Sequence, residues 1–350
     1  MDPILLRVVQ ILVALGVILT AAAYTVYLER KVCAWIQQRY GPNRVGPFGL
    51  LQPLADVIKL ILKEDIVPAR GDRIIHFISP MISVTIAIAA FALIPFASNV
   101  VIADVNIGVL YLLAITSIGV YGITLAGWSS NSKYALLGGL RSSAQMISYE
   151  LSMGLSVVGV ILLANMMTDS GQGYLSLKSI VEAQYENTWF FILNPIGMFV
   201  FITCAFAETN RTPFDLVEAE QELVGGFHTE YSSMKFALFF LAEYINIIIA
   251  SMVISTLFFG GYLAPFVEGT IRETAIWKDT FWFPMVWGIG WFGLKTLIFV
   301  FIFIWVRWTL PRFKYNQLMN IGWKSFLPVS IINLLIVGLL AFVLNEYVLN

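Results

Sequence analysis

The sequence predicts an all-α integral membrane protein, and its composition and its apolar stretches both indicate that class. The chain of 350 residues is 59% hydrophobic and 12% charged, whereas a soluble domain has about 45–50% apolar and about 25% charged residues. A bilayer core of about 30 Å needs about 20 apolar residues per helix, and eight stretches meet that length. They lie near 8–28, 77–97, 107–127, 145–167, 190–207, 236–262, 285–306 and 325–345. We expect a single membrane domain over residues 1–350.

The first apolar stretch, near 8–28, shares one feature with a cleaved signal peptide, because the small residues 21–23 lie close to its end. Its apolar run is longer than the core of a signal peptide, which has about 7–15 residues. The charged sequence Glu-Arg-Lys at 29–31 follows at once and would stop translocation. We therefore expect this stretch to stay in the protein as the first span.

The segment after the first span combines turn residues with a short amphipathic helix. Residues 41–49 have a Gly- and Pro-rich composition that is typical of turns. Apolar residues then repeat at helical spacing, and polar residues occupy the other face. The apolar set is Leu50, Leu51, Leu54, Val57, Ile58, Ile61 and Leu62, and the polar set is Gln52, Asp56, Lys59 and Lys63. At about 14 residues the helix is too short to span, so it should lie along the membrane interface. There it either anchors the loop to lipid or walls a cavity that opens to the bilayer.

Basic residues gather in four of the loops that connect the spans. The loops at 29–75, 128–144, 207–235 and 307–324 hold 8, 2, 2 and 4 Lys/Arg residues. The opposite side holds only Arg7, Lys178, Arg272 and Lys278. Because cytoplasmic loops carry an excess of Lys and Arg, the four basic loops should face the cytoplasm. An even number of spans then places both termini on the periplasmic side.

An acidic segment lies in the third of these loops. Its six carboxylates fall within 23 residues and are Glu208, Asp215, Glu218, Glu220, Glu222 and Glu230. In a helix, the spacing would place Asp215, Glu218 and Glu222 on one face. Like charges at that distance repel, and burial raises the pKa of a carboxyl group, so some members would titrate near neutral pH. A row of such groups beside a membrane suits a proton path; the alternative is a solvated acidic loop.

Three further charges, Glu150, Glu243 and Lys295, lie inside apolar stretches. A charge at the centre of a membrane helix costs about 2.5–3.5 kcal/mol on insertion scales, so a function in charge or proton transfer is favoured. The alternative is a set of Glu–Lys pairs that only fix helix packing.

An aromatic stripe at Phe236, Phe239 and Phe240 is consistent with a ligand surface, although lipid-facing packing explains such stripes more often. Arg307 and Tyr244 lie at span ends or within spans, where such residues also serve as ordinary membrane anchors.

Redox cofactors are not predicted on this chain. Its two Cys residues, Cys33 and Cys204, and its two His residues, His76 and His228, are far apart in sequence. This spacing gives no CxxC motif, no four-thiolate set for an iron–sulfur cluster and no histidine pair for haem. No GxGxxG motif follows a strand. We expect no metal site, and any redox centre should belong to partner chains.

At several of these stretches the chain closely resembles a known family, the H subunit of bacterial NADH:quinone oxidoreductase (respiratory complex I), whose mitochondrial counterpart is subunit 1 of the complex. The matching stretches are 28–31, 39–47, 49–56, 58–60, 128–135, 145–150, 208–231, 242–244 and 311–315. They occur in family order and cover all four basic loops and most spans. One departure is Ala219, where the family usually has Gly.

The resemblance implies roles that the composition does not reveal. It implies a membrane anchor for the peripheral redox arm and a tunnel through which a lipid quinone reaches an iron–sulfur cluster on a neighbouring subunit. Carried over to this sequence, the residues that line or rim the tunnel are Arg30, Arg39, Phe236, Phe239, Phe240, Tyr244 and Arg307. Those of the proton pathway are Glu150, Glu208, Asp215, Glu218, Glu220, Glu222, Glu230, Glu243 and Lys295.

The same resemblance implies the partners and the location. The expected partners are peripheral subunits, which would carry iron–sulfur clusters and FMN, and the other membrane-arm subunits of the complex. Quinone is expected as the substrate, and no nucleic acid is expected. The bacterial inner membrane is the expected location, with the mitochondrial inner membrane as the alternative. Two other functions stay open at this point: a membrane subunit of an energy-converting hydrogenase-type complex, and a free-standing cation/proton transporter. The second would favour similar halves with broken helices, and no such repeat is evident in the sequence.

Overall fold

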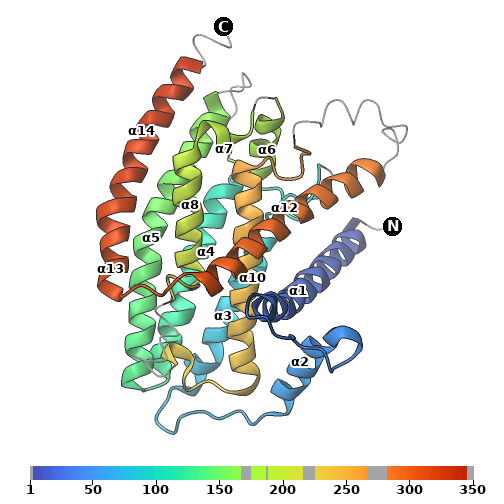
Figure 1. Cartoon of the computed structure of the whole chain (residues 1–350), viewed down its shortest axis with the longest axis vertical. Helices are drawn as coiled ribbons and strands as arrows, with labels where there is room; N and C mark the ends of the chain where they lie inside the picture. The colour runs from blue at the N-terminus through green and yellow to red at the C-terminus, as the bar shows by residue number, and fades with distance from the viewer. Residues whose placement is uncertain are drawn as a thin grey trace.

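The computed structural model describes residues 3–98, 100–166, 175–186, 188–215, 225–265 and 282–344, and this part of the chain is helical (Figure 1). Seven of its helices are long and apolar enough to cross a membrane, and an eighth, shorter apolar helix accompanies them. The predicted fold class is therefore confirmed. The long helices are α1 (Pro3–Ile36), α3 (Arg73–Phe91), α4 (Gly108–Ser129), α5 (Lys133–Met166), α10 (Ser233–Phe258), α12 (Trp282–Thr309) and a last one built from α13 (Tyr315–Asn320), a π-helical turn (Ile321–Phe326) and α14 (Leu327–Leu344).

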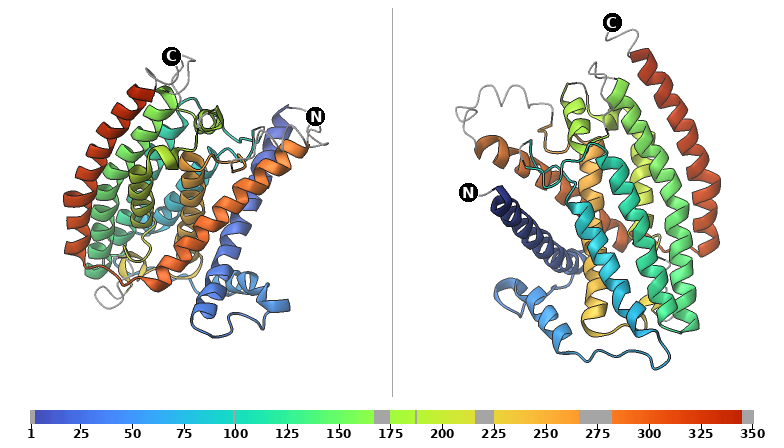
Figure 2. Two further views of the ribbon diagram at one scale, coloured as in Figure 1. Left: turned by 45° about the horizontal axis from the view of Figure 1, so that its top comes forward. Right: turned by 180° about the vertical axis from the view of Figure 1, so that it is seen from behind.

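The helices form a bundle with an oblique pair beside it. Helices α3, α4, α5, α10 and α14 run roughly side by side together with α8 (Pro195–Glu208), whereas α1 and α12 cross the bundle at a slant next to α10 (Figures 1 and 2). The outer face is apolar; on α14, Leu335 and Leu339 are 65% and 69% exposed. Such a surface suits contact with lipid rather than with water.

The fifth predicted span is broken. Residues Phe190–Leu193 form the short helix α7, and α8 begins only at Pro195. The residue before a proline disfavours the helical conformation, and Asn194 accordingly leaves it, at φ −134° and ψ 62°. Its Oδ1 accepts hydrogen bonds from the Gly197 amide at 2.9 Å and from Asn333 Nδ2 at 3.0 Å. The break therefore caps α8 and ties it to α14.

Helix α5 begins at Lys133, although hydropathy predicts a span from 145. The added turns contain polar residues that are buried against the protein instead of facing lipid. Ser142 is fully buried, and its hydroxyl donates to Asn210 Oδ1 at 3.3 Å. At the start of the predicted span, Gln145 is also fully buried and donates to the carbonyl oxygens of Ala207 at 2.8 Å and Phe214 at 2.7 Å. Hydropathy detects apolar segments that face lipid. It does not detect helical turns whose polar residues are buried in the protein, so it misses the start of α5.

The predicted amphipathic helix is present as α2 (Gln52–Leu62), and none of its residues is buried. Its polar face is fixed to the end of α1, because Asp56 accepts from Arg30 Nη1 at 2.6 Å and from Gln52 at 2.9 Å. Its apolar face is open, with Leu62 80% exposed. In Figure 1, α2 lies at the foot of α1.

The four basic loops meet at one end of the molecule. The Asp72 amide donates to the Ser129 carbonyl at 3.1 Å, which joins the first loop to the second. Ser232 Oγ donates to the Glu64 carbonyl at 3.0 Å, which joins the first to the third. The Phe313 amide donates to the Pro213 carbonyl at 3.1 Å, which joins the third to the fourth. The compartment that this end faces remains a prediction from the charge count.

Small residues allow two helices of the bundle to approach closely. A Cβ atom placed on Gly127 of α4 would lie 2.5 Å from the carbonyl oxygen of Ala135 on α5. Such contacts matter in a bilayer, where lipid tails are as apolar as side chains and helices associate through close packing.

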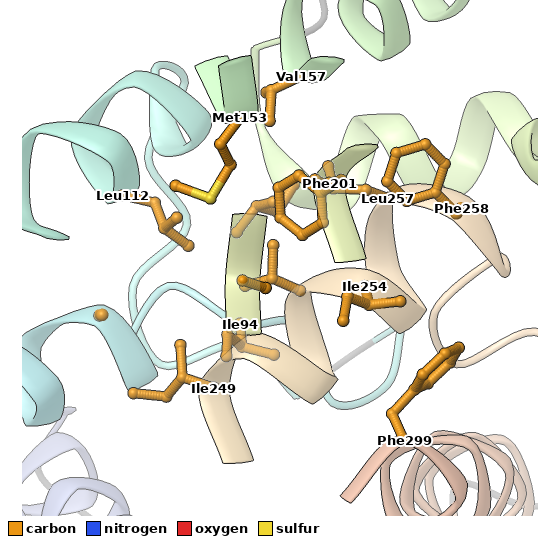
Figure 3. Packing of buried hydrophobic residues seen from close by; sticks show 14 of the residues in the cluster. Ile94, Leu112, Met153, Val157, Phe201, Ile249, Ile254, Leu257, Phe258 and Phe299 are labelled. Atoms are coloured by element: carbon orange, nitrogen blue, oxygen red, sulfur yellow. The ribbon is translucent and has the colours of Figure 1, made fainter. Parts of the chain in front are cut away.

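The buried core extends across the bundle and includes residues of α1, α3, α4, α5, α8, α10, α12 and α14. Figure 3 shows part of it, with Ile94, Leu112, Met153, Val157, Phe201, Ile249, Ile254, Leu257, Phe258 and Phe299 labelled.

Candidate functional site

A buried network of opposite charges connects three helices and a loop. Glu29, at the end of α1, is 5% exposed. Its two carboxylate oxygens accept from Arg211 Nη1 at 3.1 and 3.2 Å, and Arg307 of α12 also donates to it. On the other side, Arg211 Nε lies 2.7 Å from Oε1 of Glu243 on α10. The guanidinium also lies over the ring of Tyr244, 4.7 Å from its centroid. We call these five residues the ionic layer.

Electrostatics keep Arg211 charged. Burial lowers the pKa of its guanidinium, but the carboxylates of Glu243 and Glu29 outweigh this and raise the pKa above its ordinary value. The group is therefore a permanent cation between two carboxylates. Removing one partner from a buried pair costs about 3–5 kcal/mol, because it leaves the other charge uncompensated.

The loop after α8 positions Arg211. Its amide donates to the Phe206 carbonyl at 3.2 Å, and its carbonyl accepts from the Phe214 amide at 2.8 Å. Phe214 is buried and packs edge-on against Tyr149 of α5, with ring centroids 5.4 Å apart. Thr212 Oγ1 donates to the Arg307 carbonyl at 3.0 Å. The loop that carries Arg211 is thus held by its own backbone hydrogen bonds and by contacts with α5 and α12.

A cavity of about 890 Å³, which we call the open basin, lies on one side of the ionic layer. The turn residues 40–44 form one wall. The other lining residues are Glu29, Arg30, Cys33, Arg39, Gln52, Tyr244, Arg307 and Trp308. Four of the seven residues predicted for the quinone tunnel, Arg30, Arg39, Tyr244 and Arg307, therefore line one cavity.

A second cavity of about 120 Å³, the central cavity, lies inside the bundle. Much of its wall is apolar and includes Leu112, Met153, Val157, Phe201, Ile249 and Leu257. Its polar lining groups are Ser83, Thr116, Glu208, Thr209, Asn210, His228, Glu243 and Asn246. Glu243 therefore belongs both to the ionic layer and to this cavity.

The aromatic stripe lies at the central cavity and not at the open basin. Phe239 and Phe240 line the central cavity. Phe236 packs against Phe240, with ring centroids 4.5 Å apart.

A small side pocket of about 10 Å³ extends the central cavity. Glu208 and Thr116 line both, and Glu150 of α5 lines the side pocket. The Glu150 carboxylate accepts a hydrogen bond from Ser117. The structure thus arranges Glu243, Glu208 and Glu150 along adjoining cavities, as a row of three carboxylates.

The other residues predicted for the proton pathway lie elsewhere. Asp215 is buried and accepts from Arg312 at 2.7 Å, and Glu230 is half-buried in the loop before α10. Lys295 lies near the opposite end of α10 from Glu243, where its ammonium donates to the carbonyls of Phe259, Gly261 and Leu263 at 2.6, 2.9 and 2.6 Å. The structure does not describe residues 216–224, so Glu218, Glu220 and Glu222 lie outside the described residues.

Three residues of this site are not singled out by the sequence patterns. Glu29 belongs to the charged end of the first span, Arg211 is the cation within the acidic segment, and His228 is a histidine without ligand spacing. Glu29 and Arg211 are 182 residues apart, so no local pattern can join them. A usable signal is that all three fall in stretches that match the family.

In the part of the chain that the structure describes, no three His, Cys, Asp or Glu residues are grouped so that they could hold a metal ion. The two cysteines are buried and free.

Comparison with known proteins identifies relatives over nearly the whole chain. The sequence model of the family described as NADH dehydrogenase matches residues 9–338. NADH-quinone oxidoreductase subunit 8 of Rhodothermus marinus is 57% identical, over 93% of this chain and 94% of its own length. The H subunit of NADH-quinone oxidoreductase from Salinibacter ruber is 54% identical, over 93% of each chain. The corresponding H subunit from Rhodospirillum rubrum is 50% identical, over 94% of this chain and 92% of its own length.

Proposed function

Because the chain belongs to the NADH dehydrogenase family of membrane subunits of NADH-quinone oxidoreductase, we propose that it forms the entrance for a lipid quinone and couples quinone reduction to proton translocation. As a subunit it takes part in enzyme activity only within the complex. The observation that carries the proposal is the position of two consecutive residues of α10. Tyr244 lines the open basin, Glu243 lines the central cavity, and the guanidinium of Arg211 contacts both.

The open basin has the chemistry that a quinone head group needs. Arg30 and Arg39 line it, and guanidinium groups donate hydrogen bonds to carbonyl oxygens. Reduction to quinol adds two electrons, which we expect from an iron–sulfur partner subunit, and two protons. The charge in the basin therefore changes during each turnover.

The ionic layer can transmit that change. A negative charge in the basin competes with Glu243 for Arg211, so the contact between Arg211 and the Glu243 carboxylate weakens. Protons then redistribute among Glu243, Glu208 and Glu150, which line adjoining cavities. This is a coupling between two sites through one shared cation.

The end of the molecule where the basic loops meet is the proposed dock for the peripheral subunits, which would carry iron–sulfur clusters and FMN. That end would face the bacterial cytoplasm and both termini the periplasm, as the distribution of Lys and Arg predicts.

Substitutions in the carboxylate row test the proposal. We expect Glu150→Gln and Glu208→Gln, in the assembled complex, to lower quinone reduction and proton pumping at least about tenfold, since each removes a proton-transfer group. NADH oxidation by a hydrophilic artificial acceptor should be unchanged. If Asp215, Glu218 and Glu222 share a helix face, Glu218→Gln and Glu222→Gln should be more severe than Glu220→Gln.

The matched control is Glu182→Gln, because Glu182 forms a 3.9 Å pair with Lys178 on the other side of the molecule and is 53% exposed. Assembly is checked on native gels, and turnover and proton uptake are measured in vesicles. Fully coupled activity in Glu150→Gln and Glu208→Gln would refute the proton pathway.

A further inference from the structure

His228 lines the central cavity and lies on a loop that folds against the bundle. The short 3₁₀ turn Gly226–His228 carries it. Gly226 has φ 66°, and its Cα would lie 2.9 Å from a Cβ built on Gly138 of α5. The turn is therefore pressed against α5, and this contact directs His228 into the same cavity as Glu208 and Glu243.

Three phenylalanine rings surround the imidazole. Their centroids lie 5.2 Å (Phe227), 5.5 Å (Phe236) and 5.9 Å (Phe240) from that of His228, and all three meet it edge-on. These rings offer no strong hydrogen-bond partner. Among the described residues, no protein group forms a hydrogen bond with the His228 ring nitrogens.

The central cavity has room for water. A site needs about 10–15 Å³ and two to four polar partners to hold one water molecule. The central cavity has about 120 Å³, and Glu208, Glu243 and Asn246 line it together with His228. Several waters therefore fit, and the polar groups to hold them are present.

The imidazole is neutral at physiological pH. Burial lowers the pKa of His228 to about 4. A neutral imidazole has one nitrogen that donates and one that accepts a hydrogen bond, so it can order water on both sides without taking up charge.

We propose that His228 is a positioning residue that holds the water chain between Glu243 and Glu208. A proton that leaves Glu243 passes along these waters and binds to Glu208, and no group is oxidised or reduced in this step. The inference rests on the proposed function and deepens it by giving the proton route a residue that is not a carboxylate.

The test compares His228→Phe with His228→Gln in the assembled complex. We expect His228→Phe to lower quinone-coupled proton pumping about tenfold, the factor that corresponds to the loss of one or two hydrogen bonds, and to change the solvent isotope effect on turnover. His228→Gln should restore most of the rate, because an amide also donates and accepts. Glu182→Gln is the matched control and should leave proton pumping unchanged, since Glu182 is 53% exposed in its pair with Lys178 and does not line the central cavity.

Activity with a hydrophilic acceptor and native gels confirm assembly in every variant. One outcome would overturn the role of His228 and leave the proposed function standing. In it, His228→Phe pumps protons at the rate of the parent complex, while Glu243→Gln and Glu208→Gln lose most of the activity. Equal loss in His228→Phe and His228→Gln would also overturn it, because water positioning requires that the amide rescue. Silent Glu243→Gln and Glu208→Gln variants would instead refute the proposed function.

Discussion

Arg211 determines the balance of charge at the site because it is a buried cation shared by two carboxylates from different helices. It is 3% exposed and contacts Glu29 on one side and Glu243 on the other. A guanidinium can serve both at once because its donors point in several fixed directions in one plane, whereas an ammonium is a single point charge. The geometry of the group therefore matters as much as its charge.

We predict different failures for two Arg211 substitutions. Arg211→Met should prevent assembly, since two buried carboxylates lose their common partner at a cost of about 3–5 kcal/mol. Arg211→Lys should assemble but reduce quinone at least about tenfold more slowly, because an ammonium cannot bridge both carboxylates in the same geometry. Native gels and NADH:quinone turnover measure the two outcomes.

Lys178→Met is the matched control, because that lysine forms a partly exposed pair with Glu182 and such pairs contribute about 0–1 kcal/mol. Normal assembly and turnover in Arg211→Met would show that the ionic layer has no function.

At the scale of the helices, the sequence predicts which segments form helices more accurately than it predicts where those helices begin or break. The eight apolar stretches and the amphipathic helix after the first span all correspond to helices in the structure. The break at Asn194 and the early start of α5 at Lys133 are not predicted. The early start of α5 depends on side chains that meet only in the folded molecule, such as Ser142 with Asn210. The break follows from Pro195, a local signal that hydropathy does not detect.

The sequence likewise predicts some residues of the candidate site but not the cavity that they help to form. Glu150 and Glu243 stand out because a charge inside an apolar run is costly, and both line the cavities. The open basin cannot be predicted from local patterns, because its wall combines the turn residues 40–44 with Tyr244 and Arg307, which lie about 200 and 260 positions further along the chain.

Gly127 provides a test of close packing between α4 and α5. We predict that Gly127→Ala lowers the melting temperature of the complex, since its Cβ would lie 2.5 Å from the Ala135 carbonyl oxygen and overpacking costs about 1–3 kcal/mol. Gly119→Ala on the same helix should be neutral or slightly stabilising, because the nearest atom would lie at 3.9 Å and alanine favours helix. Thermal unfolding in detergent compares the two, and equal melting temperatures would contradict the packing argument.

At the scale of the whole molecule, the chain is a subunit that takes part in enzyme activity only within the complex. Within the described residues there is no group of ligands for a metal ion, and the open basin lies at the end where the basic loops meet. We predict that the purified chain alone, reconstituted with quinone and NADH, shows no oxidoreductase activity, and that activity requires the other subunits. Robust quinone reduction by the isolated, metal-free polypeptide would contradict this.

The ionic layer also has a consequence for biosynthesis. Arg211 is made 182 residues after Glu29, and Arg307 is made 278 residues after it. At roughly 5–20 residues per second, the ribosome takes about 15–55 s to supply the second cation. Until Arg211 is made, Glu29 in the newly inserted α1 lacks both of the cations that it contacts in the folded protein. A chain that is truncated before α12 lacks Arg307, so Glu29 has Arg211 but not Arg307 as a cationic partner. A finished subunit and a truncated one therefore differ in the charges around Glu29.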